Sequence, residues 1–141
     1  MKKLVSAMMI GFICMGFVAC GEKPQSQESA AEQAAVEVQS MAGEELTALL
    51  QDDAKTADLL LLDVRDASEF EAGHIDGATN IFVDELESRL SEIEGYKDKQ
   101  IVLYCNTGNK SGKAGEILVK NGFTKVYNAE GVKQFDYELV Q

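Results

Sequence analysis

The chain has 141 residues, which is room for one domain of ordinary size. Its formal net charge is −11 and its basic residues form no stripe, so nucleic acid is excluded as an expected partner. The acidic residues are spread along the chain, as expected for a solvated surface.

The first stretch of the chain has the features of an export signal. Two lysines follow Met1, and residues 4–19 form an uncharged apolar run that is short for a membrane span. This run ends in Phe17-Val18-Ala19-Cys20, which resembles the lipobox of bacterial lipoproteins. The resemblance implies a signal peptide at 1–19 and lipid on Cys20, which would anchor the protein in the membrane.

The location implied is the cell envelope outside the cytoplasm, on the periplasmic face of the outer membrane if the cell is Gram-negative. A plain cleaved signal peptide and an uncleaved anchor are the alternatives. Residues 20–35 are rich in Glu, Gln, Ser and Ala and predict a flexible tether. A folded domain is expected over 36–141.

The three cysteines then have different fates. Cys14 leaves with the signal peptide and Cys20 is consumed by lipid, so Cys105 remains as a lone thiol that has no disulfide partner. A lone thiol in an oxidising compartment is a hazard unless it has a function. The cysteine pattern therefore favours a functional Cys105.

The folded part alternates strand and helix patterns. We expect strands at 36–38, 59–64, 101–104 and 123–127, and helices at 41–50 with Ser40 as its cap, 67–72, 84–93 with a capping box of Asp84 and Glu87, 112–120 and 132–139. The run at 59–64 is continuously apolar, as in a strand buried on both faces. The alternation predicts an α/β fold with a mainly parallel central sheet flanked by helices on both faces.

The strongest functional signal lies at 101–111. A predicted strand ends at Cys105, and a short polar loop with Gly108 leads into a helix. This arrangement puts a nucleophile at the carboxyl end of a parallel strand and aims a helix N terminus at it. Loop N–H groups, the helix dipole and Lys110 would each favour a thiolate. The alternative is a buried core cysteine, which would need no such loop.

The same stretch resembles a known family. The loop Cys105-Asn106-Thr107-Gly108-Asn109-Lys110-Ser111 is similar to the active-site loop of rhodanese-type sulfurtransferases. Residues 62–65, 69–70, 73–75, 77–78 and 80–81 resemble the family's first signature, and 121–123 and 126–127 its segment after the active-site helix. The likeness covers 36–141 and implies a single compact rhodanese-like domain.

The resemblance implies a chemistry. Sulfane sulfur would pass from a small anionic donor such as thiosulfate to cyanide or a thiol through a persulfide on Cys105. The implied substrate-binding residues are Asn106, Thr107, Gly108, Asn109, Lys110 and Ser111. Their N–H groups would hold the persulfide, Lys110 would guide the donor, and Ser111 would either donate to the sulfur or, as we favour, cap the helix. No cofactor or metal is required, and a monomer is expected.

Four polar residues of the first signature are interpreted as structural support. They are Asp63, Arg65, Glu69 and His74. Arg65 and Glu69 are close enough in sequence to form an ion pair, within a charge network that holds the loops. His74 is interpreted as a structural histidine, because transfer through an ionised thiolate needs no general base.

The loop also departs from the family pattern. Lys110 stands where Arg is common, and Asn106 where some members have a second basic residue. Lysine holds an oxyanion as a point charge and not bidentately, which bears on substrate preference. One rival function is a phosphatase or arsenate reductase, whose longer loop would place Arg at the position of Ser111. The other is a non-catalytic binding or redox and sulfur-sensing module tethered to the membrane.

Overall fold

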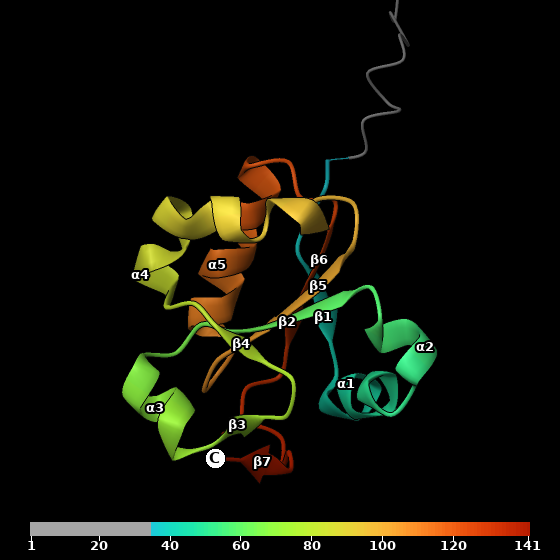
Figure 1. Ribbon diagram of the computed structural model, residues 1–141, viewed down its shortest axis with the longest axis vertical. Helices are drawn as coiled ribbons and strands as arrows, with labels where there is room; N and C mark the ends of the chain where they lie inside the picture. The colour runs from blue at the N-terminus through green and yellow to red at the C-terminus, as the bar shows by residue number, and fades with distance from the viewer. Residues whose placement is uncertain (1–34) are drawn as a thin grey trace, which may run out of the picture. The chain divides into compact units, whose positions relative to one another are not determined.

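A parallel sheet forms the centre of the computed structural model, which describes residues 35–141 (Figure 1). Within these residues, its five strands lie in the order β1 (Gln39–Met41), β6 (Lys125–Ala129), β5 (Gln100–Tyr104), β2 (Leu59–Asp63) and β4 (Thr79–Asn80). Each neighbouring pair is parallel, and β5 occupies the middle. The predicted α/β fold with a mainly parallel sheet is confirmed.

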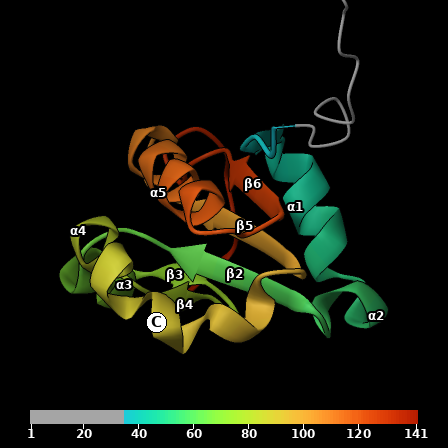
Figure 2. The same cartoon turned by 90° about the horizontal axis from the view of Figure 1, so that it is seen from above.

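Helices cover both faces of this sheet, as predicted (Figure 2). One face carries α5 (Asn109–Lys120), α4 (Val83–Leu86) and the 3-10 turns η2 (Glu87–Glu92) and η3 (Glu94–Tyr96). The other face carries α1 (Gly43–Leu50) and the short α2 (Asp53–Thr56). An apolar layer therefore lies on each side of the sheet.

Strand β2 shows why its sequence is continuously apolar. Leu60 and Leu62 belong to the cluster that packs under α5, whereas Leu61 between them packs in the cluster under α1. Successive side chains of a strand point to opposite faces, so a strand covered on both sides needs apolar residues at every position. The prediction of a buried strand rested on this pattern.

The strand ends differ from those expected from sequence. β1 lies at 39–41 and not 36–38, because its partners are residues 127–129 of β6. β6 begins at Lys125 and not Phe123, since the Phe123 N–H donates to the Leu118 carbonyl at 3.1 Å and closes the end of α5. Strand position here follows pairing and helix capping, which hydrophobic patterning alone does not reveal.

Helix α1 begins at Gly43, and the prediction that Ser40 caps it is wrong. Ser40 belongs to β1, and the N-cap residue Ala42 offers no side-chain hydrogen bond. The Gly43 N–H donates instead to the carboxylate of Glu130 at 2.8 Å. A residue distant in sequence thus satisfies the first N–H group of the helix.

The expected helix at 84–93 is also corrected. Its place is taken by α4 and η2, and no capping box forms, since the residue before α4 is Phe82 and no side chain caps the helix. The Val83 N–H donates to the Val64 carbonyl at 3.2 Å. Contact with the chain after β2 therefore fixes where this helix starts.

The end of the chain forms a strand and not the helix expected at 132–139. β7 (Leu139–Val140) pairs antiparallel with β3 (His74–Ile75), next to α3 (Ala67–Ala72) (Figure 1). A single helical turn forms, with the Phe135 N–H donating to the Gly131 carbonyl at 3.0 Å. It stops there, because the Tyr137 hydroxyl bonds the Glu130 carbonyl at 2.8 Å and draws the chain back.

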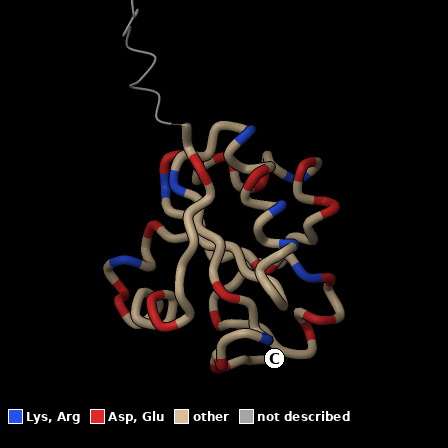
Figure 3. Tube along the Cα trace, turned by 180° about the vertical axis from the view of Figure 1, so that it is seen from behind, with Lys and Arg blue, Asp and Glu red and all other residues tan. Residues whose placement is uncertain are grey.

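Charged residues of both signs are distributed along the described part of the chain (Figure 3). Surface pairs join some of them, such as Lys99 with Asp58 at 2.7 Å and Arg89 with Glu92 at 2.8 Å. Within 35–141, no helix combines the length and apolar character needed to cross a membrane. The expected signal peptide, the lipidated Cys20 and nearly all of the tether lie outside the described residues and stay predictions.

Candidate active site

Cys105 follows β5 directly, at the carboxyl end of the central strand. It is a free cysteine whose side chain is 1% exposed, and it packs in the apolar cluster on the α5 side of the sheet. The sequence placed it at this strand end correctly. Its deep burial makes the groups around the sulfur decisive for its chemistry.

The loop after Cys105 turns at Gly108. The φ angle of Gly108 is +80°, a left-handed conformation that side chains disfavour. This turn lets α5 begin at Asn109, three residues earlier than expected, with Gly108 as its N-cap. The Gly108 N–H donates to the Cys105 Sγ at 3.1 Å. The start of α5 is thus directed at the sulfur.

Ser111 lies in the first turn of α5 and is fully buried. Its Oγ is 3.3 Å from the Cys105 Sγ and 2.6 Å from the Oδ1 of Asn128 in β6. The favoured capping role is wrong, because the N-cap position belongs to Gly108. The other reading, a hydroxyl directed at the sulfur, matches the geometry.

These contacts decide the acidity of the thiol. Burial raises the pKa of Cys105, but the Ser111 hydroxyl and the N–H groups of Ser111, Thr107 and Lys110 lower it by more in total. The pKa of Cys105 therefore lies below its ordinary value. A thiolate is the reactive form of cysteine, so this environment favours a nucleophile.

The remaining loop side chains face outward or sideways. Asn106 donates from Nδ2 to the Oε1 of Glu69 at 2.6 Å, which ties the loop to α3. Lys110 is exposed, with its Nζ 5.3 Å from the centre of the Phe82 ring. Thr107 and Asn109 are exposed as well. Thr107 and Lys110 direct backbone N–H groups at the sulfur, and Lys110 also offers a charge at the surface.

The back of the loop rests on the segment after β6. The N–H groups of Val132 and Lys133 donate to the carbonyls of Cys105 and Asn106 at 2.9 and 3.0 Å. A Cβ at Gly131 would overlap the Asn106 carbonyl. Sequence reasoning missed Gly131 as a support of the site.

Asn128 was also missed, although its place at the end of β6 was a signal. It pairs in register with Leu103 of β5, one strand away from the cysteine. Carboxyl ends of neighbouring parallel strands meet at one edge of a sheet. Knowing the strand order would have brought Asn128 to the cysteine loop.

The predicted support residues form a network, with one correction. Arg65 bonds through its guanidinium to Asp63 and to the Gly73 carbonyl at 2.8 Å. The expected pair of Arg65 with Glu69 is wrong, because Glu69 binds Asn106 instead. Asp63 and Arg65 are both buried and hold the turn after β2.

His74 is engaged by its own surroundings. Its Nδ1 lies 2.9 Å from the Phe70 carbonyl, and its ring stacks on Phe70 with 3.8 Å between centroids. Its backbone pairs with Val140 in the small sheet. These contacts agree with a structural histidine.

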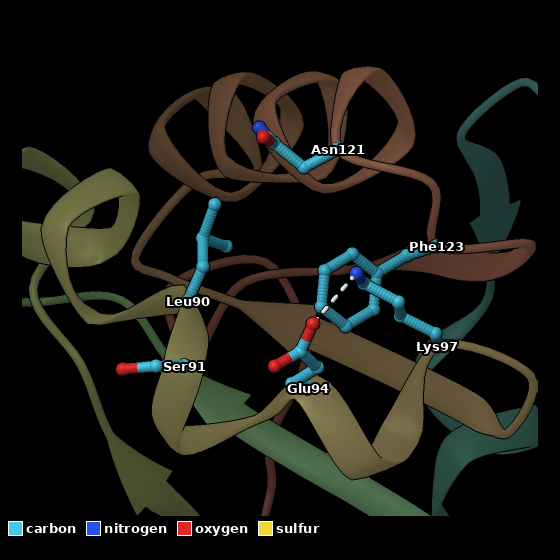
Figure 4. Close-up of a pocket in the computed structure, with 6 residues that line it drawn as sticks. All are labelled: Leu90, Ser91, Glu94, Lys97, Asn121 and Phe123. Atoms are coloured by element: carbon cyan, nitrogen blue, oxygen red, sulfur yellow. Dashed lines mark hydrogen bonds and ion pairs between the residues drawn. The ribbon is translucent and has the colours of Figure 1, made fainter.

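A pocket elsewhere in the fold offers less chemistry. It has a volume of about 240 Å³ and is lined by Leu90, Ser91, Glu94, Lys97, Asn121 and Phe123 (Figure 4). Two of the lining residues, Glu94 and Lys97, form an ion pair at 3.0 Å. Among residues 35–141, no group of three His, Cys, Asp or Glu side chains is arranged to hold a metal ion. Cys105 therefore remains the candidate reactive group.

Comparison with known proteins adds to this geometry. Residues 42–134 match the Rhodanese-like domain family. The chain is 48% identical over 71 residues to the uncharacterized protein YqhL of Bacillus subtilis (strain 168), covering 50% of this chain and 55% of YqhL. It is 36% identical over 91 residues to the tRNA uridine(34) hydroxylase of Escherichia coli (strain K12 / DH10B), covering 62% of this chain and 25% of the hydroxylase.

The chain thus spans about half of the first relative and a quarter of the second. Among solved structures, the fold is similar to that of a rhodanese with anions from E. coli, with a TM-score of 0.54 and 35% identity. That similarity covers 59% of this chain and 98% of the E. coli chain. The likeness therefore covers the smaller protein nearly end to end.

Proposed function

Because the chain belongs to the rhodanese-like domain family, we propose that it is a sulfurtransferase in which Cys105 carries sulfur as a persulfide. The observation that carries the proposal is the pair of donors on the cysteine sulfur. The Gly108 N–H and the Ser111 Oγ lie 3.1 and 3.3 Å from the Cys105 Sγ. Such donors stabilise a sulfur-centred anion inside an otherwise apolar site.

The first step loads the enzyme. The Cys105 thiolate attacks the outer sulfur of thiosulfate and forms a new S–S bond. The bond between the two donor sulfurs breaks, and its electron pair leaves with sulfite. The enzyme keeps one negative charge, now on the outer sulfur of the persulfide. No external oxidant or reductant takes part.

The second step unloads it. Cyanide, or an acceptor thiolate, attacks the outer sulfur and breaks its bond to Cys105. The products are thiocyanate, or a persulfide on the acceptor, and the Cys105 thiolate. The leaving thiolate is stabilised by the same donors that activated it, so one set of hydrogen bonds serves both steps.

The loop and its charge support an anionic donor. Successive N–H groups in such a turn form a cradle for negative charge. Lys110 would attract the donor over a distance, which matters because the chain as a whole carries a net charge of −11. The E. coli rhodanese to which the chain is similar was solved with anions, which supports anion binding by this type of domain.

One observation favours a second candidate function. Cys105 is 1% exposed, so a donor reaches the sulfur only if the loop opens or the outer groups move. A thiol this enclosed would also suit a sulfur-sensing or redox module that reacts slowly and does not turn over. Catalytic turnover distinguishes the two.

The proposal is tested by thiocyanate formation from thiosulfate and cyanide. Wild type is expected to turn over many times, and Cys105→Ala to form no thiocyanate above the uncatalysed rate. Cys105→Ser serves as a matched control that keeps a hydroxyl in place of the thiol. Turnover by either variant at the wild-type rate would overturn the mechanism, and a single turnover by wild type would favour the sensing module.

We also propose that the protein acts in the cell envelope, held to the membrane by lipid on Cys20 and acting as a monomer. The basis for the lipid anchor is the sequence alone, which contains the lipobox-like Phe17-Val18-Ala19-Cys20. Incorporation of labelled palmitate in bacterial cells tests it. Labelling of wild type that is lost in Cys20→Ser supports the anchor, and equal labelling of both excludes it.

A further inference from the structure

We infer that Asn128 is a positioning residue for Cys105, because it competes with the cysteine thiolate for the single hydroxyl proton of Ser111. The inference concerns the same thiol as the proposed function and rests on it for its role in catalysis. Its test is the titration of that thiol, which requires no sulfur transfer. The argument follows from hydrogen-bond partners around Ser111.

The orientation of the Asn128 amide is fixed by the backbone. Its Nδ2 lies 3.1 Å from the carbonyl oxygen of Gly108, which can only accept a hydrogen bond. The amide nitrogen must therefore face Gly108, and Oδ1 must face Ser111 at 2.6 Å. An amide oxygen only accepts, so Ser111 has to be the donor in that contact.

All three side chains are satisfied while Cys105 is a thiol. The Ser111 proton goes to Asn128 Oδ1 at 2.6 Å, and a lone pair of the same hydroxyl is free to accept the S–H of Cys105 across 3.3 Å. The protons run in one direction, from sulfur to serine to asparagine. This series of hydrogen bonds favours the protonated form of Cys105.

Ionisation of Cys105 creates a conflict. The thiolate gains from the Ser111 hydroxyl in addition to the loop N–H groups, because this hydroxyl lies 3.3 Å from the sulfur. A serine hydroxyl carries one proton, so donation to sulfur withdraws it from Asn128. The loss of a donor to the half-buried Asn128 amide oxygen costs free energy. Asn128 therefore restrains the help that Ser111 gives the thiolate.

This restraint has a use in sulfur transfer. A thiolate of very low pKa is a weak nucleophile, although it leaves more readily from a persulfide. By keeping Ser111 partly engaged, Asn128 holds the nucleophilicity of Cys105 up while the loop N–H groups keep it ionised. Replacement of Asn128 should therefore slow the loading step and speed the unloading step.

Within residues 35–141, the Asn128 side chain bonds Ser111 and Gly108 and no charged group. The charged side chains on the elements around the loop include Asp63, Arg65, Asp66, Glu69, Lys110, Lys113, Glu116, Glu130 and Lys133. Asp63 and Arg65 bind each other, and Glu69 binds Asn106. Substitution of Asn128 leaves these contacts in place, so a change in the pKa of Cys105 would report on the Ser111 proton.

The test measures the pKa of Cys105 from the pH dependence of its alkylation by iodoacetamide, followed on the peptide that carries it. Asn128→Ala is expected to lower the pKa by about half a unit to one unit, roughly a three- to tenfold gain in thiolate below the pKa. Ser111→Ala is expected to raise it. In the Ser111→Ala background, Asn128→Ala should have no effect.

Asn121 provides the matched control. It lies at the other end of α5, where its side chain bonds the Ile117 carbonyl at 2.8 Å. Asn121→Ala should leave the pKa of Cys105 unchanged. An equal shift from Asn128→Ala with and without Ser111, or a rise in place of a fall, would overturn the inference, since Asn128 would then act through Gly108.

A second variant keeps the test decisive if Asn128→Ala does not fold. Asn128→Asp places a carboxylate beside Ser111 and cannot donate to the Gly108 carbonyl, and its charge alone raises the pKa of Cys105. The inference therefore predicts a larger rise in the presence of Ser111 than in the Ser111→Ala background, and an equal rise in both would contradict it. Should the titrations behave as expected while wild type forms no thiocyanate, the proposed function fails and the role of Asn128 stands.

Discussion

Two turns lie side by side at the carboxyl edge of the sheet, and they handle charge in opposite ways. Asp63, at the end of β2, pairs in register with Tyr104, the residue before Cys105. The turn after β2 is closed by the buried ion pair of Asp63 and Arg65. The loop after β5 instead surrounds a sulfur with backbone N–H groups and one hydroxyl.

The difference separates support from chemistry. In the β2 turn each charge is neutralised by a partner, so neither is available to a substrate. In the cysteine loop the negative charge is stabilised by dipoles that a reacting sulfur can keep using as its bonds change. The charges of Asp63 and Arg65 are thus directed at each other, whereas the neutral donors of the cysteine loop are directed at the sulfur.

The largest expected effect comes from breaking the ion pair. Arg65→Ala leaves Asp63 buried without its partner, and a loss of about 3 to 5 kcal/mol in the free energy of unfolding follows. Urea denaturation measures it. Arg89, whose side chain is 35% exposed and forms surface ion pairs, is the control, and Arg89→Ala should cost less than about 1 kcal/mol. A cost for Arg65→Ala as small as that of the control would mean that the pair contributes little to the fold.

Substitution of two left-handed glycines separates the effect of backbone strain from the effect on the cysteine sulfur. Gly108→Ala and Gly77→Ala both place a side chain at positive φ, +80° and +78°, and each should lose about 1 to 3 kcal/mol of stability. Sulfur transfer should fall only in Gly108→Ala, because a turn that relaxes away from positive φ moves the residue 108 N–H away from the sulfur. Nothing lies within 4 Å of a Cβ at Gly77, so that variant controls for strain alone. Equal activity in the two variants would remove Gly108 from the site.

Loss of the hydroxyl tests the pKa directly. Because Ser111 lowers the pKa of Cys105, Ser111→Ala raises it, and the acid limb of the transfer rate moves to higher pH. The rate at neutral pH should fall by roughly tenfold and recover as the pH rises above the new pKa. Ser91→Ala, on the exposed surface of η2, is the control. An unchanged pH profile would show that the hydroxyl does not act on the thiolate.

The smallest effect concerns the surface charge. Lys110→Ala should lower kcat/KM for thiosulfate a few-fold at low salt, with the deficit shrinking as salt screens the charge. Lys113→Ala, one turn further along α5 and equally exposed, should change it less. Steady-state kinetics at two ionic strengths measures both. Identical losses in the two variants would mean that only net charge matters.

Local sequence signals predicted one half of this arrangement. The apolar run of β2, the position of α3 and the strand leading to Cys105 follow from alternation, burial and capping within a few residues. The α/β class followed from their order. These features depend on neighbours in the chain, so they are readable before the fold is known.

The other half depends on contacts between distant segments. Asn128 meets Ser111 only because β6 lies beside β5, and Gly131 supports the loop only because the chain returns there. The single helical turn before β7 ends through Tyr137 bonding to Glu130. Even the early start of α5 required the left-handed Gly108, which a glycine in sequence permits but does not prove.

Mass measurement of the intact protein tests the central claim most directly. The purified, reduced protein would be mixed with thiosulfate, weighed, and weighed again after cyanide is added, beside Cys105→Ala. Persulfide chemistry predicts a gain of one sulfur atom on wild type alone, lost to cyanide with thiocyanate released. No gain on folded wild type with a free thiol, or an equal gain on Cys105→Ala, would contradict the account.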